Sequence, residues 1–136
     1  MREDRLLDFA RRYTAAWCSQ DAASVAAFYS ADGSLSVNDG VPATGRPAIT
    51  EVAQSFMTLF PDMQVVLNRV CVQGESAEYH WTLLGTNTAP GGTGHRVRIS
   101  GFEIWQFGND GLIFSSRGQF DAVSYTHLTL PTILRV

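Results

Sequence analysis

Glu103 is a carboxylate in a row of residues that is otherwise apolar. Residues two apart on a strand share a face, and in the β-like run 96–107 the row that contains Glu103 also contains Val97, Ile99, Gly101, Trp105 and Phe107. If this face is inward, burial disfavours the charged carboxylate, so Glu103 would keep its proton near neutral pH and donate a hydrogen bond. The opposite face holds Phe102 and Ile104 as well as polar residues. Alternation therefore leaves open a second interpretation, in which Glu103 pairs with an arginine across the sheet.

The other residues with reactive side chains form no known catalytic or metal motif. His80 and His95 have no partner at metal-ligand spacing, so we expect no metal and no cofactor. No GxSxG elbow and no glycine-rich nucleotide fingerprint is present. The chain has no lysine, which excludes Schiff-base chemistry and lysine-anchored pyridoxal phosphate. Tyr79 and Trp81 are expected to face inward, toward a pocket. Because His80 lies between them on the same strand, we expect it on the outer sheet face, at a subunit contact.

Three helices are predicted in the first half of the chain. Large apolar residues recur every three or four positions over 5–17, which is the spacing of one helical face. A short helix is predicted over 21–28, capped by the Asp21 side chain, and the SADG run at 30–33 is predicted to end it. A third helix is predicted over 47–60, beginning at a proline.

The remainder is predicted to be mainly strand. Polar and apolar residues alternate in a short run that begins at residue 34, and the second half of the chain is rich in β-branched and aromatic residues. The predicted strands are 34–38, 65–72, 77–86, 96–107 and 112–123. A flexible loop is predicted at 87–94, and the GNDG run at 108–111 predicts a hairpin connection. Helices followed by an antiparallel meander indicate an α+β fold, with one strongly bent sheet around the helices.

Length and composition limit the functional classes. The 136 residues, 45% of them hydrophobic, suffice for one domain. A net charge of −3 with no basic run gives no electrostatic reason to expect nucleic acid or an anionic membrane as a partner. No apolar stretch approaches the roughly 20 residues of a membrane span, and the N-terminus resembles no signal peptide. Two cysteines without CxxC spacing favour reduced thiols. We therefore expect a cytoplasmic protein.

The last eleven residues, Thr126–Val136, continue no upstream pattern. Their sequence THLTLPTILRV resembles a translated sequencing-adapter tail, and an ordinary edge strand broken by Pro131 is the alternative. We assign residues 1–125 to the domain and place no function in 126–136.

Several motifs in order resemble the SnoaL-like branch of the NTF2-like superfamily. They are two short helices, an ADG turn, the TGRPAI helix start, the strand WTLLGTNT, and a V-x-I-x-G-x-E-x-W strand that leads into DGLI. The resemblance covers Leu6 to Tyr125 and implies a cone-shaped barrel with three N-terminal helices packed in a curved, mainly antiparallel sheet, and one deep pocket. The family includes polyketide cyclases, ketosteroid isomerases, limonene epoxide hydrolases and non-catalytic modules, so the fold alone does not choose a reaction.

The run RYTAAWCSQD at 12–21 is similar to the first helix of ketosteroid isomerases. That resemblance implies that Tyr13 donates to a substrate oxyanion, with Glu103 at the position of the second donor. Simple packing is the alternative for Tyr13. The general-base aspartate of those enzymes corresponds to Ser36, whose hydroxyl cannot replace it, and the acid–base aspartate of polyketide cyclases falls on or near Gly118.

The epoxide hydrolases fit less well, because their water-activating residues correspond to Trp81, Leu83 and Gly118. For Asn38, contact with a pocket ligand and simple turn chemistry remain equally open. The resemblance and the strand alternation together predict catalytic roles for Tyr13 and Glu103, and ligand contacts from Trp17, Ser36, Asn38, Trp81, Gly118 and Phe120.

The expected function is the binding of a small hydrophobic ligand that bears a carbonyl or enol group. If the protein is an enzyme, isomerisation or aldol-type cyclisation by proton transfer is expected, with Tyr13 and Glu103 stabilising the oxyanion. The alternative is a non-catalytic ligand-binding or association module, which the serine at 36 and the glycine at 118 favour. We expect a homodimer through the outer sheet face, which includes His80, Arg98, Gln106 and Arg117.

Overall fold

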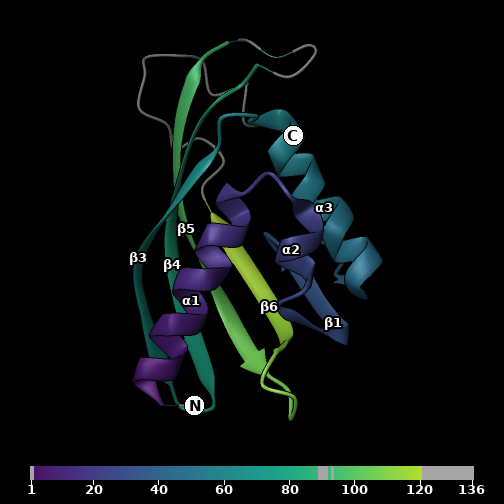
Figure 1. The fold of residues 1–136 in the computed structure, drawn as a ribbon, viewed down its shortest axis with the longest axis vertical. Coiled ribbons are helices and arrows are strands. Elements are labelled where there is room, and N and C mark those ends of the chain that lie inside the picture. Colours follow the sequence, from purple (N-terminus) through teal and green to yellow (C-terminus); the bar gives the residue numbers. More distant parts are fainter. Residues whose placement is uncertain (1, 89–91, 93, 121–136) are drawn as a thin grey trace.

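The computed structural model describes residues 2–88, 92 and 94–120, and the chain folds as three helices against one six-stranded sheet (Figure 1). The domain end expected at Tyr125 and the tail Thr126–Val136 lie outside the described residues. The elements are α1 (Glu3–Cys18), α2 (Ala22–Ala26), β1 (Tyr29–Val37), β2 (Ala43–Thr44), α3 (Arg46–Leu59), β3 (Gln64–Gln73), β4 (Ser76–Thr86), β5 (Arg96–Phe107) and β6 (Ile113–Phe120).

The three helices lie close to where the sequence predicts them. The apolar face of α1, which includes Leu6, Phe9, Tyr13 and Trp17, is buried, and two acidic residues in its first turn suit the positive end of the helix dipole. Helix α3 has Pro47 in its first turn, as expected. The capping prediction for α2 was wrong in its detail: Asp21 occupies the N-cap position, but its side chain makes no capping hydrogen bond.

The first strand begins earlier than predicted. The SADG run does not end the preceding helix as a turn but lies inside β1, where the pairing with β6 shifts register between Tyr29 and Ser34. Such an irregularity accommodates turn-type residues within a strand. Gly33 lies at this point, and a Cβ there would come within 2.8 Å of the Ile113 carbonyl oxygen. The absence of a side chain therefore permits the close approach of β1 to β6.

The strand order is β2-β1-β6-β5-β4-β3. All neighbours are antiparallel except β1 and β6, which run parallel, so the mainly antiparallel sheet is as expected. Within the described residues the sheet is curved but open, with β2 and β3 at its two ends, and the strands do not close into the expected barrel. Figure 1 shows α1 lying across the sheet, and α2 and α3 beside β1. No described helix is long and apolar enough to cross a membrane.

Strand pairing brings two rows of residues together beneath the helices. In one row, Val37 of β1, Gly118 of β6, Glu103 of β5 and Tyr79 of β4 are successive partners. In the next row, Phe120, Gly101 and Trp81 are successive partners. Each row therefore contains a glycine: Gly118 leaves space above the sheet, whereas the position above Gly101 is occupied by its neighbours.

Candidate functional site

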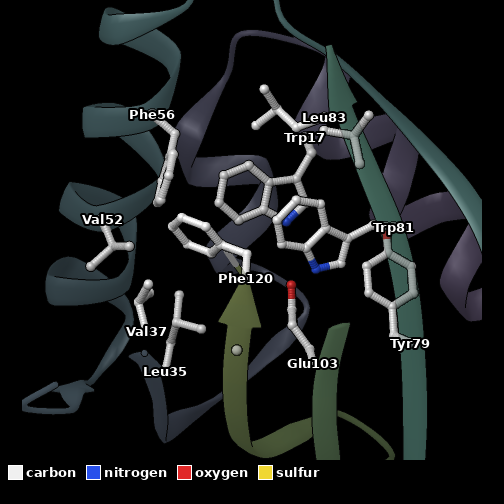
Figure 2. A pocket seen from close by; sticks show the side chains of 12 residues that line it. Trp17, Leu35, Val37, Val52, Phe56, Tyr79, Trp81, Leu83, Glu103 and Phe120 are labelled. Carbon is white, nitrogen blue, oxygen red and sulfur yellow. The ribbon is translucent and has the colours of Figure 1, made fainter. Parts of the chain in front are cut away.

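A pocket lies between the helices and the sheet, and both rows contribute to its wall (Figure 2). Its volume is about 60 Å³, the space of a few water molecules. Glu103 is the only acidic or basic residue among those that line it. The lining residues are Trp17, Leu35, Val37, Val52, Phe56, Val65, Tyr79, Trp81, Leu83, Glu103, Gly118 and Phe120.

The Glu103 carboxyl group is held by three hydrogen bonds to a single oxygen. Its Oε1 accepts from the Tyr13 hydroxyl at 2.9 Å, from Trp105 Nε1 at 2.8 Å and from the Ser116 hydroxyl at 2.8 Å. The residue is only 7% exposed. No described residue donates to Oε2, and Figure 2 shows the carboxyl end of Glu103 directed into the pocket. The two oxygens thus have different roles: Oε1 anchors the group, and Oε2 is available to a ligand.

Burial is the main influence on the protonation of Glu103. It raises the pKa of the carboxyl above its usual value, and the hydrogen bonds from Trp105, Ser116 and Tyr13 oppose this in part. Because Oε1 already accepts three donors, the proton of the neutral acid resides on Oε2. The group can therefore present either an O–H donor or a basic oxygen to the pocket.

Tyr13 lies behind Glu103 and is not a lining residue. The Tyr13 side chain is fully buried, and its hydroxyl contacts the Tyr29 hydroxyl at 2.9 Å in addition to Glu103. Burial, followed by the proximity of Glu103, raises the pKa of both tyrosines well above the usual value. Both hydroxyls therefore remain protonated, and the Tyr13 hydroxyl is linked to the pocket through its hydrogen bond to Glu103.

Tryptophan rings form the wall on either side of the carboxyl group. The rings of Trp81 and Phe120 meet edge to face, with centroids 5.9 Å apart. They can meet because Gly101 lies between them: a Cβ there would be 2.7 Å from atoms of both side chains. The indole N–H groups of Trp17 and Trp81 are buried and make no hydrogen bond.

The structure brings most of the predicted site residues to one place. Five of the eight line the pocket, and three do not. The five are Trp17, Trp81, Glu103, Gly118 and Phe120, whereas Tyr13, Ser36 and Asn38 lie outside its wall.

Ser36 and Asn38 are excluded from the wall for different local reasons. Leu35 and Val37 line the pocket, and alternation places the side chain of Ser36 on the other face of β1. Asn38 is exposed with a φ of 49°, and its Oδ1 accepts from the Phe120 backbone N–H at 2.9 Å. Asn38 therefore holds the end of β6 in place.

Two groups of residues at the site were not predicted from the sequence: the hydrogen-bond partners behind Glu103, and the side chains of α3 that line the pocket. Ser116 and Trp105 are hydrogen-bond partners of Glu103; Trp105 shares the alternation of Glu103, which is a signal that could have suggested it. Val52 and Phe56 fall within the helix predicted over 47–60, and the part of the pocket wall that they form depends on how α3 packs. Among the described residues, no cluster of three or more metal-ligating side chains is present.

Comparison with known proteins identifies the class to which this fold and pocket belong. Residues 10–116 match the model of the SnoaL-like domain, and the chain is a member of the SnoaL-like family. No curated protein matches the chain significantly.

Solved structures show the same fold, the ketosteroid isomerase-like or NTF2-like fold. A hypothetical protein of Catenulispora acidiphila DSM 44928 with this fold, in complex with trimethylamine, superposes with a TM-score of 0.76 at 15% identity over 87% of this chain and 88% of its own. SalBIII, an epoxide hydrolase/cyclase-like enzyme of pyran-ring formation in salinomycin, has a TM-score of 0.73 at 17% identity, over 89% of this chain and 95% of its own. A protein of Jannaschia sp. CCS1 that is assigned as a SnoaL-like polyketide cyclase has a TM-score of 0.68 at 14% identity, over 84% of this chain and 86% of its own.

Proposed function

We propose that this protein binds a small apolar ligand bearing a carbonyl or enol group, and that Glu103 transfers a proton at the carbon next to that group. One observation carries the proposal. In an otherwise uncharged pocket, Glu103 has one oxygen anchored by three donors and the other directed at the ligand space. The family and its cyclase-like and isomerase-like neighbours are consistent with this class of chemistry.

The reaction consists of two proton transfers. Ionised Oε2 removes a proton from the carbon adjacent to the carbonyl, and the electron pair of the broken C–H bond forms the C=C bond of an enolate. Isomerisation follows when the proton on Oε2 returns to a different carbon of the conjugated enolate. In an aldol-type cyclisation, the enolate carbon instead attacks a second carbonyl of the same ligand, and the alkoxide that forms takes the proton from Oε2.

The surroundings of Glu103 suit both steps. A base is most effective when its pKa lies near the working pH, and burial moves the pKa of this carboxyl upward from its usual value. Tyr13, Trp105 and Ser116 donate to Oε1 in either protonation state, so the group stays oriented while its proton leaves and returns. In this proposal Tyr13 is a positioning residue. Glu103 is then the general base, a role that the serine at position 36 cannot fill.

The test is the exchange of α-protons of cyclohexanone for deuterium in D₂O, followed by NMR. The wild type is expected to accelerate the exchange, and Glu103→Gln to reduce the protein-catalysed rate by a factor on the order of 100 or more. Glutamine is the matched change, because its amide oxygen can still accept the three hydrogen bonds. Equal rates for wild type and variant would refute the assignment of Glu103 as the base.

A non-catalytic binding module is the second candidate. It is favoured by the pocket volume of about 60 Å³, which is well below the roughly 300 Å³ or more typical of ligand sites, and by the absence of a carboxylate at 36 and 118. In that case, cyclohexanone would bind without any acceleration of exchange.

We also propose a cytoplasmic homodimer. The free thiols of Cys18 and Cys71 support a reducing compartment. The outer face of β4 and β5 supports self-association, because the rings of His80 and Phe102 contact each other there in a tilted arrangement, with centroids 5.6 Å apart. They lie among polar side chains, and such a mixture is common at interfaces.

A further inference from the structure

Two polar groups in the pocket wall have no partner in the protein. They are the indole N–H groups of Trp17 and Trp81, both inaccessible to solvent. Trp17 is only 9% exposed as a residue. Figure 2 shows both indole nitrogens turned toward the middle of the pocket, on the same side as the Glu103 carboxyl.

An unsatisfied buried N–H is costly, and most native proteins avoid it. Both rings are held by their neighbours: Trp17 packs edge to face on Phe56 at 6.0 Å, and Trp81 on Phe120 at 5.9 Å. The N–H groups therefore cannot turn to solvent without disturbing the pocket wall.

The protein offers few acceptors in this space. The hydroxyl of Tyr79 is engaged with Thr14 at 2.6 Å, and Oε1 of Glu103 already accepts three donors. Neither indole N–H makes a hydrogen bond to Oε2 of Glu103. The Trp17 indole N–H lies near enough to the Tyr13 hydroxyl to lower the pKa of Tyr13, but the contact does not have the geometry of a hydrogen bond. A ligand acceptor is thus the natural partner for both donors.

We propose that Trp17 and Trp81 donate their indole N–H groups to the carbonyl oxygen of the ligand. This inference rests on the proposed function and names the groups that stabilise the negative charge on that oxygen when Glu103 removes the proton. An sp² oxygen has two lone pairs and can accept from both indoles. The oxyanion donors are then these two tryptophans rather than Tyr13, whose hydroxyl is occupied behind Glu103.

The same geometry selects against a cation. Aromatic walls with one carboxylate bind ammonium groups when ring faces surround the charge. Here the N–H edges of two rings, which carry partial positive charge, point inward. The ligand class that fits is a neutral ketone, lactone or enol, and a methylated ammonium ion does not fit.

The decisive experiment is a titration of ¹⁵N-labelled wild-type protein with cyclohexanone, in which the indole N–H signals are followed by NMR. The Trp17 and Trp81 signals are expected to move downfield as they donate to the ketone. Trp105 is the internal control, because its indole already donates to Glu103 at 2.8 Å. Methylenecyclohexane, which has the same shape without the oxygen, should bind without these downfield shifts.

Variants provide a second measurement. Trp17→Phe and Trp81→Phe should each lower the ratio of cyclohexanone to methylenecyclohexane affinity by about 3- to 10-fold, as expected for one lost donor. Phe56→Leu is the matched control: it trims the apolar wall and should weaken both probes equally. If either tryptophan variant does not fold, the wild-type titration still decides.

The two proposals fail in different ways. If cyclohexanone binds, as seen by methyl shifts of Leu35 and Val52, but the Trp17 and Trp81 signals respond alike to both probes, the indole assignment is overturned and ligand binding stands. If trimethylammonium binds more tightly than cyclohexanone, the indole assignment is also overturned. If neither carbonyl nor alkene probe binds, the proposed function fails and this inference fails with it.

Discussion

The two carboxyl oxygens of Glu103 lie in different surroundings and have different roles. Three donors converge on Oε1, while Oε2 faces the largely apolar pocket and accepts no hydrogen bond from a described residue. Burial raises the pKa of the carboxyl, and the three hydrogen bonds limit the increase. The balance between these two effects can be measured both in stability and in rate.

Glu103→Gln should change how stability depends on pH. The pKa of Glu103 is raised in the folded protein above the 4.5 of an unperturbed glutamate, so the folded state holds this proton more tightly. Its contribution is fully present below the unfolded pKa and is lost as pH rises through the folded pKa. The melting temperature of the variant minus that of the wild type should therefore increase over this window and then level off. A difference independent of pH would show that the carboxyl is not perturbed.

Tyr13→Phe should shift the pH profile of proton exchange. The Tyr13 hydroxyl stabilises the ionised form of Glu103, so its loss raises the pKa of Glu103 further and moves the rising limb of the rate profile to higher pH. Tyr79→Phe is the matched control, since the Tyr79 hydroxyl bonds to Thr14 instead; whatever its effect on the rate, the midpoint should stay in place. A Tyr13→Phe profile that falls in height without moving would indicate a purely structural role.

At the scale of the elements, two glycines with different surroundings shape the pocket. Gly101 in β5 lies beneath the rings of Trp81 and Phe120, where a Cβ would be 2.7 Å from each and would also collide with the Gln119 carbonyl oxygen. Gly118 in β6 faces Glu103, but a Cβ there would meet no atom closer than 3.5 Å. The first glycine is required for strand packing, whereas the second only leaves space.

Gly101→Ala should therefore destabilise the protein, and Gly118→Ala should not. Overpacking at Gly101 should lower the free energy of unfolding by about 1 to 3 kcal/mol, because β6 or the Trp81 ring must move. Gly118→Ala should leave it within about 1 kcal/mol of the wild type. Urea denaturation of the three proteins compares these values, and equal stability of the two variants would contradict the close approach at Gly101.

At the scale of the whole molecule, none of the three helices in the described part of the chain covers the outer face of the curved sheet (Figure 1). We expect light scattering to report about twice the chain mass of 14.9 kDa, since His80, Arg98, Gln106 and Arg117 lie on strands of this sheet. Phe102→Glu should dissociate the dimer by placing a charge beside His80. Gln54→Glu, on the exposed side of α3, adds the same charge elsewhere and should not. A wild-type monomer at all concentrations would remove this proposal.

Periodicity predicted the elements well where one pattern continued without interruption. The apolar spacing of α1 and the alternation that puts Glu103 in a row with Ile99 and Trp105 both reappear as buried faces. Strict alternation fails in β6: it would place Phe114 on the same face as Gly118, yet Phe114 is 49% exposed while Ile113 is buried. A register shift in the β5–β6 pairing near Phe107 accounts for this, and such a shift reverses the facing of side chains.

The amino-acid sequence by itself determined the helices and most strand positions, because these depend on residue spacing along a single element. Alternation also placed Glu103 in an apolar row, but it left open whether that row faces inward. The tertiary structure decided which side chains meet. Ser36 is turned away from the pocket by its position between Leu35 and Val37, and Tyr13 is placed behind Glu103 rather than beside a ligand. The unpartnered indoles of Trp17 and Trp81 come from different elements, α1 and β4, so their convergence depends on how the helix packs on the sheet.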